Sequence, residues 1–399
     1  MPTAGFASCV HPTAVRPGAY DLLSIFLASM AVRLFALGFA LLAFHIPFAE
    51  YADKGDGESY QRYAAAICGD RSALSEYDTR VFPGYPALIA LVHEATRLPF
   101  AAGGLAVTMV SAALAASLSA ALFADARIGW AMVALIPHWP VNSSLVMGEA
   151  PLLALVTAGL LLGLRGRAVA ASVVLGMAGL VRPVACFAVL GLMLAELKRR
   201  RWGRAFAAGA LAAAIVGIGV FLLHRAFGDA LHGVHVYANS THAYGGQIFR
   251  WPFESLVTVP LRSQVSLERV LYIYLQVVLT LVACARLARR AFATRTESAR
   301  GGIACGELVE SVESVVGDLP TTGIIDTAAA VWLTGNTLFI LCIGSGVAGW
   351  GFHHFPRFML PALPAFFWAF RDLLPHRAIV WVLVAAAMLF PTVWGVSGA

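Results

Sequence analysis

Charged side chains are scarce in this sequence. Asp, Glu, Lys and Arg make up 13% of its 399 residues, whereas 59% belong to the hydrophobic set. A soluble domain carries about 25% charged residues, so a water-soluble enzyme of this length would expose too much apolar surface. Intrinsic disorder is excluded too, because it requires low hydrophobicity and high charge. Apolar runs of about 20 residues recur along the chain. They predict an all-α polytopic membrane protein with a single membrane domain, residues 1–399.

Paired cysteines are also absent. The six cysteines are scattered without a C-x-x-C pair, which argues against a disulfide framework or a structural zinc site.

No internal repeat is evident, and this weighs against the inverted-repeat architecture of many transporters. Residues 20–46 are too long for the apolar part of a signal peptide, so we expect them to form the first span. The net charge of +6 is typical of basic cytoplasmic loops, so we expect no nucleic-acid partner.

The apolar segments predict about 11–12 transmembrane or partly spanning helices. They lie near 20–46, 103–124, 128–141, 145–164, 168–196, 205–224, 268–286, 326–344, 358–374 and 378–396. A shorter segment, 83–98, is interrupted by proline, histidine and charged residues. The sequence leaves open whether this segment crosses the bilayer.

Basic loops set the predicted orientation. Lys and Arg cluster at 165–167, 198–204 and 286–300, and such loops face the cytoplasm by the positive-inside rule. Residues 295–325 then form a cytoplasmic connector. The outer loops are 47–82, 225–266 and 345–357, and they hold much of the His, Tyr and acidic content. We therefore expect the functional site on the outer face. The Ala-, Gly- and Arg-rich composition suggests a bacterial inner membrane with that face toward the periplasm.

Segment 168–196 is too short for two full crossings, although basic clusters flank both of its ends. Two crossings need about 40 residues. The sequence therefore predicts a hairpin of two short helices that meet at Arg182-Pro183, where proline opens the helix. Such a hairpin places Arg182 at membrane depth, where a charged residue usually marks a functional site. The alternative is an arginine at a helix end that extends toward the membrane surface.

The first outer loop, 47–82, contains the predicted catalytic carboxylate. Asp56, Tyr60 and Ala64 follow one another at intervals of four residues, so they share one face of a helix that begins near Asp56. The N-terminus of that helix favours a carboxylate. On its own, the same pattern with Asp53 and Glu58 also fits a solvated helix start. We also expect juxtamembrane helices within this loop.

Five motifs in order carry a family resemblance. They are D-x-x-x-Y-x-x-x-A from Asp56, RVFPGYPALIAL (80–91), VNSSLVMGEAPLLALVTAGLLLGLRGR (141–167), GMAGLVRPVACF (176–187) and HHFPRFMLPALPAFFWAF (353–370). In these motifs the chain resembles the GT-C superfamily of integral-membrane glycosyltransferases, which use polyprenyl-phosphate sugars. Its branches with similar stretches are the GPI-mannosyltransferase-like enzymes and the lipid A aminoarabinose transferases.

The resemblance implies a hexosyl- or mannosyltransferase that moves a sugar, with inversion, from a polyprenyl-phosphate donor to a lipid, glycan or protein acceptor. Asp56 is the predicted general base, because the attacking hydroxyl must lose its proton to a carboxylate. Arg182 and Arg357 are predicted to bind the phosphate. The other predicted substrate-binding residues are Asp53, Glu58, Tyr60, Glu149, His353 and His354. No cofactor is certain, and the sequence leaves open whether the acidic residues hold a divalent metal ion.

Other functions remain as alternatives. A transporter or flippase of lipid-linked sugars also places an arginine at membrane depth, but it does not require a carboxylate in a long first outer loop. Ser345 and His353 suggest a rhomboid-type serine protease. They lie only eight positions apart, whereas rhomboid proteases carry these groups on separate helices. His232-x-x-His235 has a spacing compatible with metal binding, but no third ligand is placed. A purely structural membrane subunit would leave the polar loops unexplained.

Overall fold

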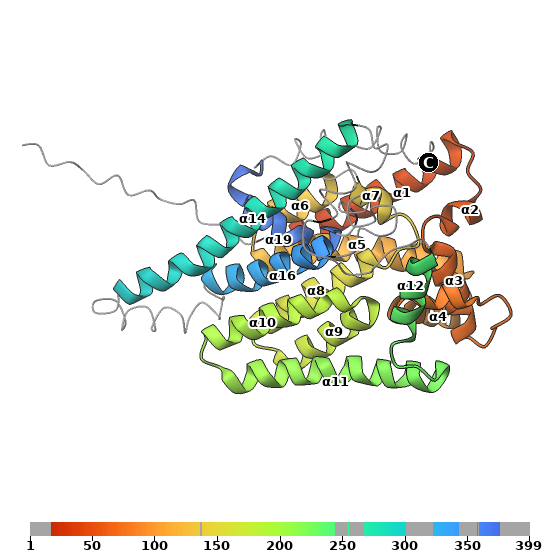
Figure 1. The fold of residues 1–399 in the computed structure, drawn as a ribbon. Helices are drawn as coiled ribbons and strands as arrows, with labels where there is room; N and C mark the ends of the chain where they lie inside the picture. The colour runs from red at the N-terminus through yellow and green to blue at the C-terminus, as the bar shows by residue number, and fades with distance from the viewer. Residues whose placement is uncertain are drawn as a thin grey trace, which may run out of the picture.

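Helices are the only regular secondary structure in the described part of the chain. The computed structural model describes residues 17–135, 138–243, 254, 267–300, 322–342, 357 and 359–375, and no strand occurs among them (Figure 1). Five helices in these ranges are long and apolar enough to cross a bilayer. They are α1 (Ala19–Ala43), α5 (Phe100–Phe123), α11 (Trp202–Phe227), Val270–Phe292 within α14 (Leu267–Arg300) and Gly323–Cys342 within α16 (Thr322–Cys342). The prediction of an all-α polytopic membrane protein is confirmed.

Shorter helices connect and surround these spans. They are α2 (Phe48–Asp53), α3 (Gly57–Ile67), η1 (Glu76–Arg80), α4 (Gly84–Thr96), α6 (Ala126–Ala134), α7 (His138–Asn142), α8 (Glu149–Leu164), α9 (Ala168–Val181), η2 (Pro183–Ala185), α10 (Cys186–Lys198), α12 (His232–Ala243), η3 (Leu360–Ala362), α19 (Leu363–Ala369) and η4 (Arg371–Leu373). Residues 47–82 therefore contain short helices, α2, α3 and η1, where juxtamembrane helices were expected. Helix α4 has 13 residues and is about 20 Å long, which is shorter than the hydrocarbon core of a bilayer, about 30 Å.

Four of the predicted segments lie partly or wholly outside the described residues. The connector expected at 295–325 begins within α14, which ends at Arg300, and it ends within α16, which starts at Thr322. Residues 301–321 between them lie outside the described ranges, as does the last apolar segment, 378–396. In the predicted outer loop 225–266, the residues after α12 also lie outside the described ranges, apart from Glu254. In the predicted outer loop 345–357, Arg357 is the described residue.

Helices α9 and α10 form the hairpin expected around Arg182. Helix α9 ends at Val181, Arg182 adopts an extended backbone, and Pro183 opens η2 before α10 begins. The helices have 14 and 13 residues, which gives each a length of about 20 Å. At the far end of the hairpin, Nη2 of Arg199 donates to the carbonyl of Leu164 at 3.4 Å. This contact brings the two flanking basic loops together and confirms the hairpin.

The predicted cytoplasmic and outer loops gather at opposite ends of the bundle. Lys198 Nζ donates to the carbonyl of Ala291 at 2.7 Å, so the basic stretch of α14 lies beside the loop after α10. At the other end, η1 packs against α12, and Thr79 Oγ1 is 2.8 Å from Nε2 of His232. The hairpin tip lies toward this second end, because the last turn of α9 packs against α4, which follows η1 (Figure 1). The N-terminus of α8 lies there too, since its Glu149 binds Arg182.

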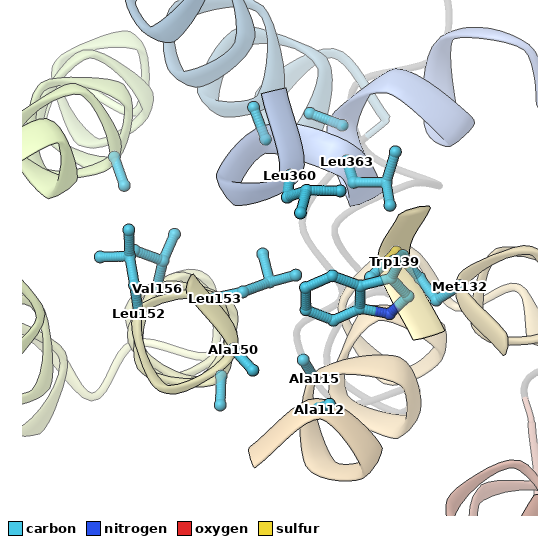
Figure 2. Packing of buried hydrophobic residues seen from close by; sticks show 14 of the residues in the cluster. Ala112, Ala115, Met132, Trp139, Ala150, Leu152, Leu153, Val156, Leu360 and Leu363 are labelled. Carbon is cyan, nitrogen blue, oxygen red and sulfur yellow. The ribbon is translucent and has the colours of Figure 1, made fainter. Parts of the chain in front are cut away.

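Small residues let the central helices approach one another. Helix α5 buries Gly103, Gly104, Ala112, Ala115, Ala116 and Ala120, and small residues at such interfaces permit close backbone packing in membranes. Figure 2 shows the indole of Trp139 lying over Ala112 and Ala115, with Leu360 of η3 on its other side. Trp139 is 1% exposed. The core therefore joins α5, α7 and the last described segment of the chain.

Gly84 sets the position of the hairpin tip. A Cβ added to this glycine would lie 2.6 Å from the carbonyl carbon of Leu180 and 2.7 Å from the amide nitrogen of Val181. Such distances are too short for any side chain, so the first turn of α4 packs directly on the last turn of α9. That contact fixes the backbone immediately before Arg182.

Candidate functional site

A tight turn between α2 and α3 presents Asp56. Gly55 has a positive φ of 69°, a conformation that glycine adopts without strain. A Cβ on Gly57 would lie 2.0 Å from the carbonyl oxygen of Ala52, so this position also requires glycine. Asp56 itself precedes the first residue of α3, as predicted, but its side chain makes no capping hydrogen bond with the helix. The carboxylate is directed into the protein instead.

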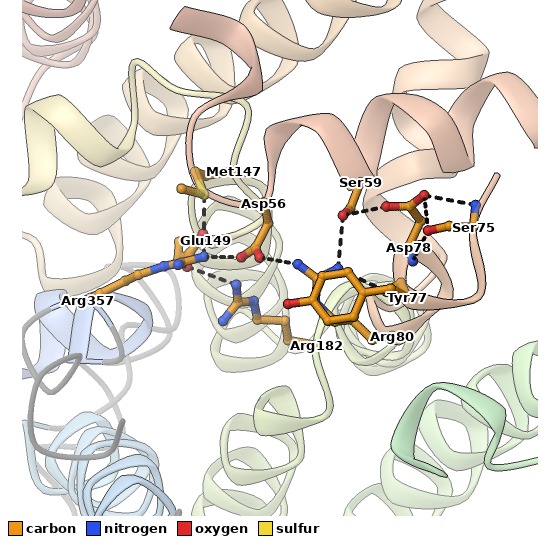
Figure 3. A network of polar contacts seen from close by, with 10 residues as sticks. All are labelled: Asp56, Ser59, Ser75, Tyr77, Asp78, Arg80, Met147, Glu149, Arg182 and Arg357. Carbon is orange, nitrogen blue, oxygen red and sulfur yellow. Dashed lines mark hydrogen bonds and ion pairs between the residues drawn. The ribbon is translucent and has the colours of Figure 1, made fainter. Parts of the chain in front are cut away.

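Two arginines bind the Asp56 carboxylate, one on each oxygen (Figure 3). Nη2 of Arg357 donates to Oδ2 at 2.6 Å, and Nη2 of Arg80 donates to Oδ1 at 2.8 Å. Asp56 and Arg357 are 301 positions apart in the sequence. The fold therefore unites the first outer loop with the segment just before η3.

Glu149 binds two arginines through a single oxygen. Its Oε1 accepts from Nε of Arg357 at 2.6 Å and from Nη2 of Arg182 at 2.8 Å. Glu149 is the first residue of α8, and Arg182 directly follows α9. Arg357 thus bridges the two carboxylates. The predicted residues Asp56, Glu149, Arg182 and Arg357 lie together in one network (Figure 3).

The network is graded in its access to solvent. The Glu149 side chain is 1% exposed, whereas those of Arg182, Arg357 and Asp56 are 20%, 19% and 25% exposed. Oε2 of Glu149 is buried and has no hydrogen-bond partner among the described residues. Glu149 therefore forms the floor of the cluster, and the other three groups keep part of their surface accessible.

The cluster carries a surplus of positive charge. Three arginines (Arg80, Arg182 and Arg357) face two carboxylates, which leaves one positive charge uncompensated. Burial raises the pKa of Asp56, but the charges of Arg357, Arg80 and Arg182 outweigh it and hold that pKa well below its usual value. Asp56 is therefore ionised at neutral pH, and the cluster as a whole favours an anion.

Arg80 was not among the predicted site residues, although it begins one of the resembling motifs. Its side chain is 9% exposed. Besides Asp56 it donates through Nη1 to Ser59 Oγ and to the Tyr77 carbonyl, each at 2.9 Å. Its guanidinium lies 3.7 Å from the centroid of the Tyr77 ring. Its place at the start of the motif 80–91 was one available signal, and its basic charge in a loop predicted to face outward, against the positive-inside trend, was another.

Arg33 is a second residue that sequence reasoning missed. It lies within α1 and is fully buried. Its Nε donates to Ser143 Oγ at 2.7 Å, and its Nη1 donates to the Ser29 side chain and carbonyl. The neighbouring Ser144 bonds the Tyr51 hydroxyl at 2.7 Å. The segment that leads into Glu149 is thus held from both α1 and α2.

The other predicted site residues take different positions. Asp53 accepts a hydrogen bond from Gln61 at 2.9 Å, and Glu58 pairs with Arg62 on the exposed side of α3. Tyr60 is buried and packs edge-on against Tyr85, with ring centroids 4.8 Å apart. A Cβ on Gly148 would lie 3.1 Å from its hydroxyl, so Tyr60 adjoins the residue before Glu149. His353 and His354 lie outside the described residues.

The histidines of the second outer loop make separate contacts. His232 bonds Thr79 and stacks on Phe227, with ring centroids 4.3 Å apart. His235 pairs with Asp229 at 2.7 Å. Among the described residues, no group of three or more His, Cys, Asp or Glu side chains is arranged to hold a metal ion. In the arginine cluster, both carboxylates already accept hydrogen bonds from guanidinium groups. These guanidinium donors suit an anion better than a divalent cation.

Comparison with known families gives one match. The model of glycosyltransferase family 87 matches residues 82–314, which is more than half of the chain. A search of curated proteins finds no match. The matched range contains Glu149 and Arg182, whereas Asp56, Arg80 and Arg357 lie outside it.

Proposed function

The chain belongs to glycosyltransferase family 87, a membrane family of the GT-C type, and we propose that it transfers a hexose, with inversion, from a polyprenyl-phosphate donor. The resemblance to the GT-C superfamily is thereby confirmed, and the chain is a membrane glycosyltransferase. Family membership favours this enzyme over the flippase alternative. The donor, the stereochemistry, the residue roles and the sidedness are parts of the proposal.

The observation that carries the proposal is the cluster of three arginines and two carboxylates around Asp56. A polyprenyl-phosphate sugar is a phosphodiester with one negative charge, which matches the surplus positive charge of the cluster. Guanidinium groups bind phosphate oxygens with paired, charge-assisted hydrogen bonds. Arg182 and Arg357, each about one-fifth exposed, are the proposed phosphate ligands.

The charge of the cluster continues to match that of its ligand through the transfer step. The acceptor hydroxyl attacks the anomeric carbon, its O–H bond breaks, and Asp56 takes the proton as general base. The bond between the anomeric carbon and the phosphate oxygen breaks, and the lipid phosphate leaves as a monoester with about two negative charges at neutral pH. Protonation of Asp56 raises the surplus of the cluster to two positive charges. The arginines therefore balance both the bound donor and the leaving group, as electrostatic catalysis requires.

The position of the cluster suits a lipid-linked donor. The hairpin helices α9 and α10 are about 20 Å long, whereas the neighbouring α11 is about 39 Å long. The tip that carries Arg182 therefore ends inside the depth that α11 spans. A phosphate held there keeps its polyprenyl chain in the bilayer. The basic loops lie at the opposite end of the hairpin, which supports an outer-face site in an inner membrane by the positive-inside rule.

The test is a transfer assay with the purified chain in detergent and a panel of polyprenyl-phosphate hexoses, beginning with mannose. Asp56→Asn should lower turnover by about 10²–10⁴-fold, the usual contribution of a general base. The matched control, Asp53→Asn, changes an exposed carboxylate that only accepts from Gln61 and should stay near wild type. Near-normal turnover of Asp56→Asn contradicts the assignment of the base.

Two further arms test the donor class. Arg182→Ala should raise the donor KM more than it lowers protein yield, because one phosphate ligand is lost. Transfer from a nucleotide sugar, but from none of the lipid phosphates, would refute the proposed donor. Chelator added to the wild-type assay should leave the transfer rate unchanged. A transfer rate that falls on chelation and recovers with a divalent ion would show that a metal ion takes part.

A further inference from the structure

Each oxygen of the proposed base accepts a hydrogen bond from a different arginine in this structure. Each oxygen of Asp56 accepts from one guanidinium group, and a carboxylate held in this way is a weak proton acceptor. Its lowered pKa agrees with this. Asp56 becomes a stronger acceptor for the proton of a sugar hydroxyl when one of the two arginines changes its partner, because a neighbouring positive charge is then lost. The contacts of the two arginines differ, and the difference indicates which one does so.

Arg80 is held in place by the outer loop itself. It donates to Ser59 and to the Tyr77 carbonyl and stacks on the Tyr77 ring. Ser59 in turn donates to Asp78 Oδ1 at 2.8 Å, and Asp78 accepts from the Ser75 amide and hydroxyl at 3.0 and 2.7 Å. The Asp78 side chain is 3% exposed. If its bond to Asp56 were lost, Arg80 would still keep all its other contacts.

Arg357 has one partner, Asp56, that a phosphate can replace. Its polar contacts are Asp56 Oδ2, Glu149 Oε1 and the Met147 sulfur at 3.4 Å. Nε binds Glu149, whereas Nη2 binds Asp56. The Nη2 group can therefore pass from the carboxylate to a phosphate oxygen while Nε stays on Glu149. Arg80, which is 9% exposed against 19% for Arg357, is less accessible to a ligand.

We infer that Arg80 is a positioning residue that holds Oδ1 of Asp56 throughout the reaction, while Arg357 exchanges Oδ2 for the donor phosphate. This inference rests on the proposed function. It assigns the proton to Oδ2, the oxygen that Arg357 vacates. It also sets an order, because Asp56 accepts the proton of the acceptor hydroxyl more readily once the donor phosphate has drawn Arg357 away.

The kinetic test compares Arg80→Gln with Arg357→Gln. Arg80→Gln should lower kcat by about 10–100-fold and leave the donor KM within about twofold, as expected when a contact that acts on the chemical step is lost. Arg357→Gln should raise the donor KM at least about tenfold, because it removes a phosphate ligand. Arg71→Gln is the matched control, since Arg71 is an exposed arginine of the same loop. A raised donor KM in Arg80→Gln, with kcat retained, would overturn the inference.

The pH profile separates positioning from a merely structural role. A cation beside Asp56 lowers its pKa, so removing Arg80 should move the acid limb of the kcat/KM profile to higher pH, and Arg80→Lys should move it part of the way back. Tyr77→Leu removes only the stacked ring at a half-exposed position, and it should lower kcat severalfold even if Arg80→Gln folds poorly. An acid limb that stays in place in both Arg80 variants contradicts the inference.

A binding measurement makes the inference independent of turnover. Polyprenyl phosphate without sugar should raise the apparent Tm of the wild type and of Arg80→Gln to a similar extent, and should fail to raise that of Arg357→Gln. If all three proteins respond alike, or if Arg80→Gln alone loses the response, the proposed division between the arginines is wrong. If the wild type binds polyprenyl phosphate but transfers no sugar from any polyprenyl-phosphate sugar, the proposed function fails while the division between the arginines stands.

Discussion

Removal of the charge on Glu149 is the sharpest test of how the arginine cluster is held. Glu149→Gln keeps the size of the side chain and one carbonyl oxygen but leaves Arg182 and Arg357 without their shared anion. Oε1 now accepts two charge-assisted hydrogen bonds, at 2.8 and 2.6 Å. The variant replaces them with bonds to a neutral amide. The surplus of the cluster rises from one to two positive charges.

The size of the effect follows from the contacts and their burial. Hydrogen bonds to charged groups contribute about 1.5–3 kcal/mol each. The guanidinium donors keep their charge in the variant, so about half of the two contributions is lost, about 2–3 kcal/mol together. Breaking a fully buried ion pair costs about 3–5 kcal/mol. The arginines are about one-fifth exposed, and water screens their charges in part. We therefore expect a destabilisation at the lower end, about 2–3 kcal/mol.

Thermal unfolding in detergent measures this loss as a fall in apparent Tm. Glu94→Gln is the matched control, because Glu94 forms an exposed pair with Arg97 whose loss should cost below about 0.5 kcal/mol. A double-mutant cycle with Arg182→Met should show a coupling of about 1–2 kcal/mol, since the arginine matters less once Glu149 is neutral. If Glu149→Gln lowers Tm no more than Glu94→Gln does, Glu149 does not hold the arginines and the reasoning fails.

Two further predictions concern the scaffold of the site. Gly84→Ala should destabilise the protein by about 1–3 kcal/mol through overpacking on α9 and lower transfer by shifting Arg182. The control Gly217→Ala, with open space around its Cβ, should be neutral or stabilising in thermal unfolding, and equal effects of the two would contradict the packing argument. Hydrogen bonds from Ser75 and Ser59 outweigh burial and lower the pKa of Asp78 below its unfolded value. Its contribution to stability is therefore present above that unfolded value of about 3.9 and is lost as the pH falls through the folded pKa. Asp78→Asn should accordingly lower Tm at pH 7, and the difference from wild type should shrink toward pH 3; a difference that does not depend on pH would show that the charge of Asp78 is unimportant.

The hairpin at Arg182 was predictable because its causes are local. A proline follows the arginine, basic clusters flank the segment, and its length is too short for two crossings. The helix start at Asp56 was predictable for a similar reason, since glycine stands on both sides of it. In both cases, neighbouring residues within a few turns determine the backbone. The structure reproduces the two features where they were expected.

The choice among similar side chains was not predictable in the same way. Asp53, Asp56 and Glu58 lie within six positions of one another, yet only the carboxylate of Asp56 meets the arginines in the described part of the chain. Arg62, Arg71 and Arg80 occur in the same outer loop, and Arg80 alone binds Asp56. The packing of η1 against α3 makes that selection, and no local pattern encodes it.

The sequence by itself therefore determined that this protein lies in a membrane and that it resembles membrane glycosyltransferases. It also determined the short list of candidate site residues. It did so because scarce charge and basic loops reflect the demands of the bilayer, and because helix-breaking residues set the local backbone. Only the tertiary structure decided which arginine binds which carboxylate oxygen. Those pairings join residues up to 301 positions apart, and they arise from helix packing that brings four separate segments to one end of the bundle.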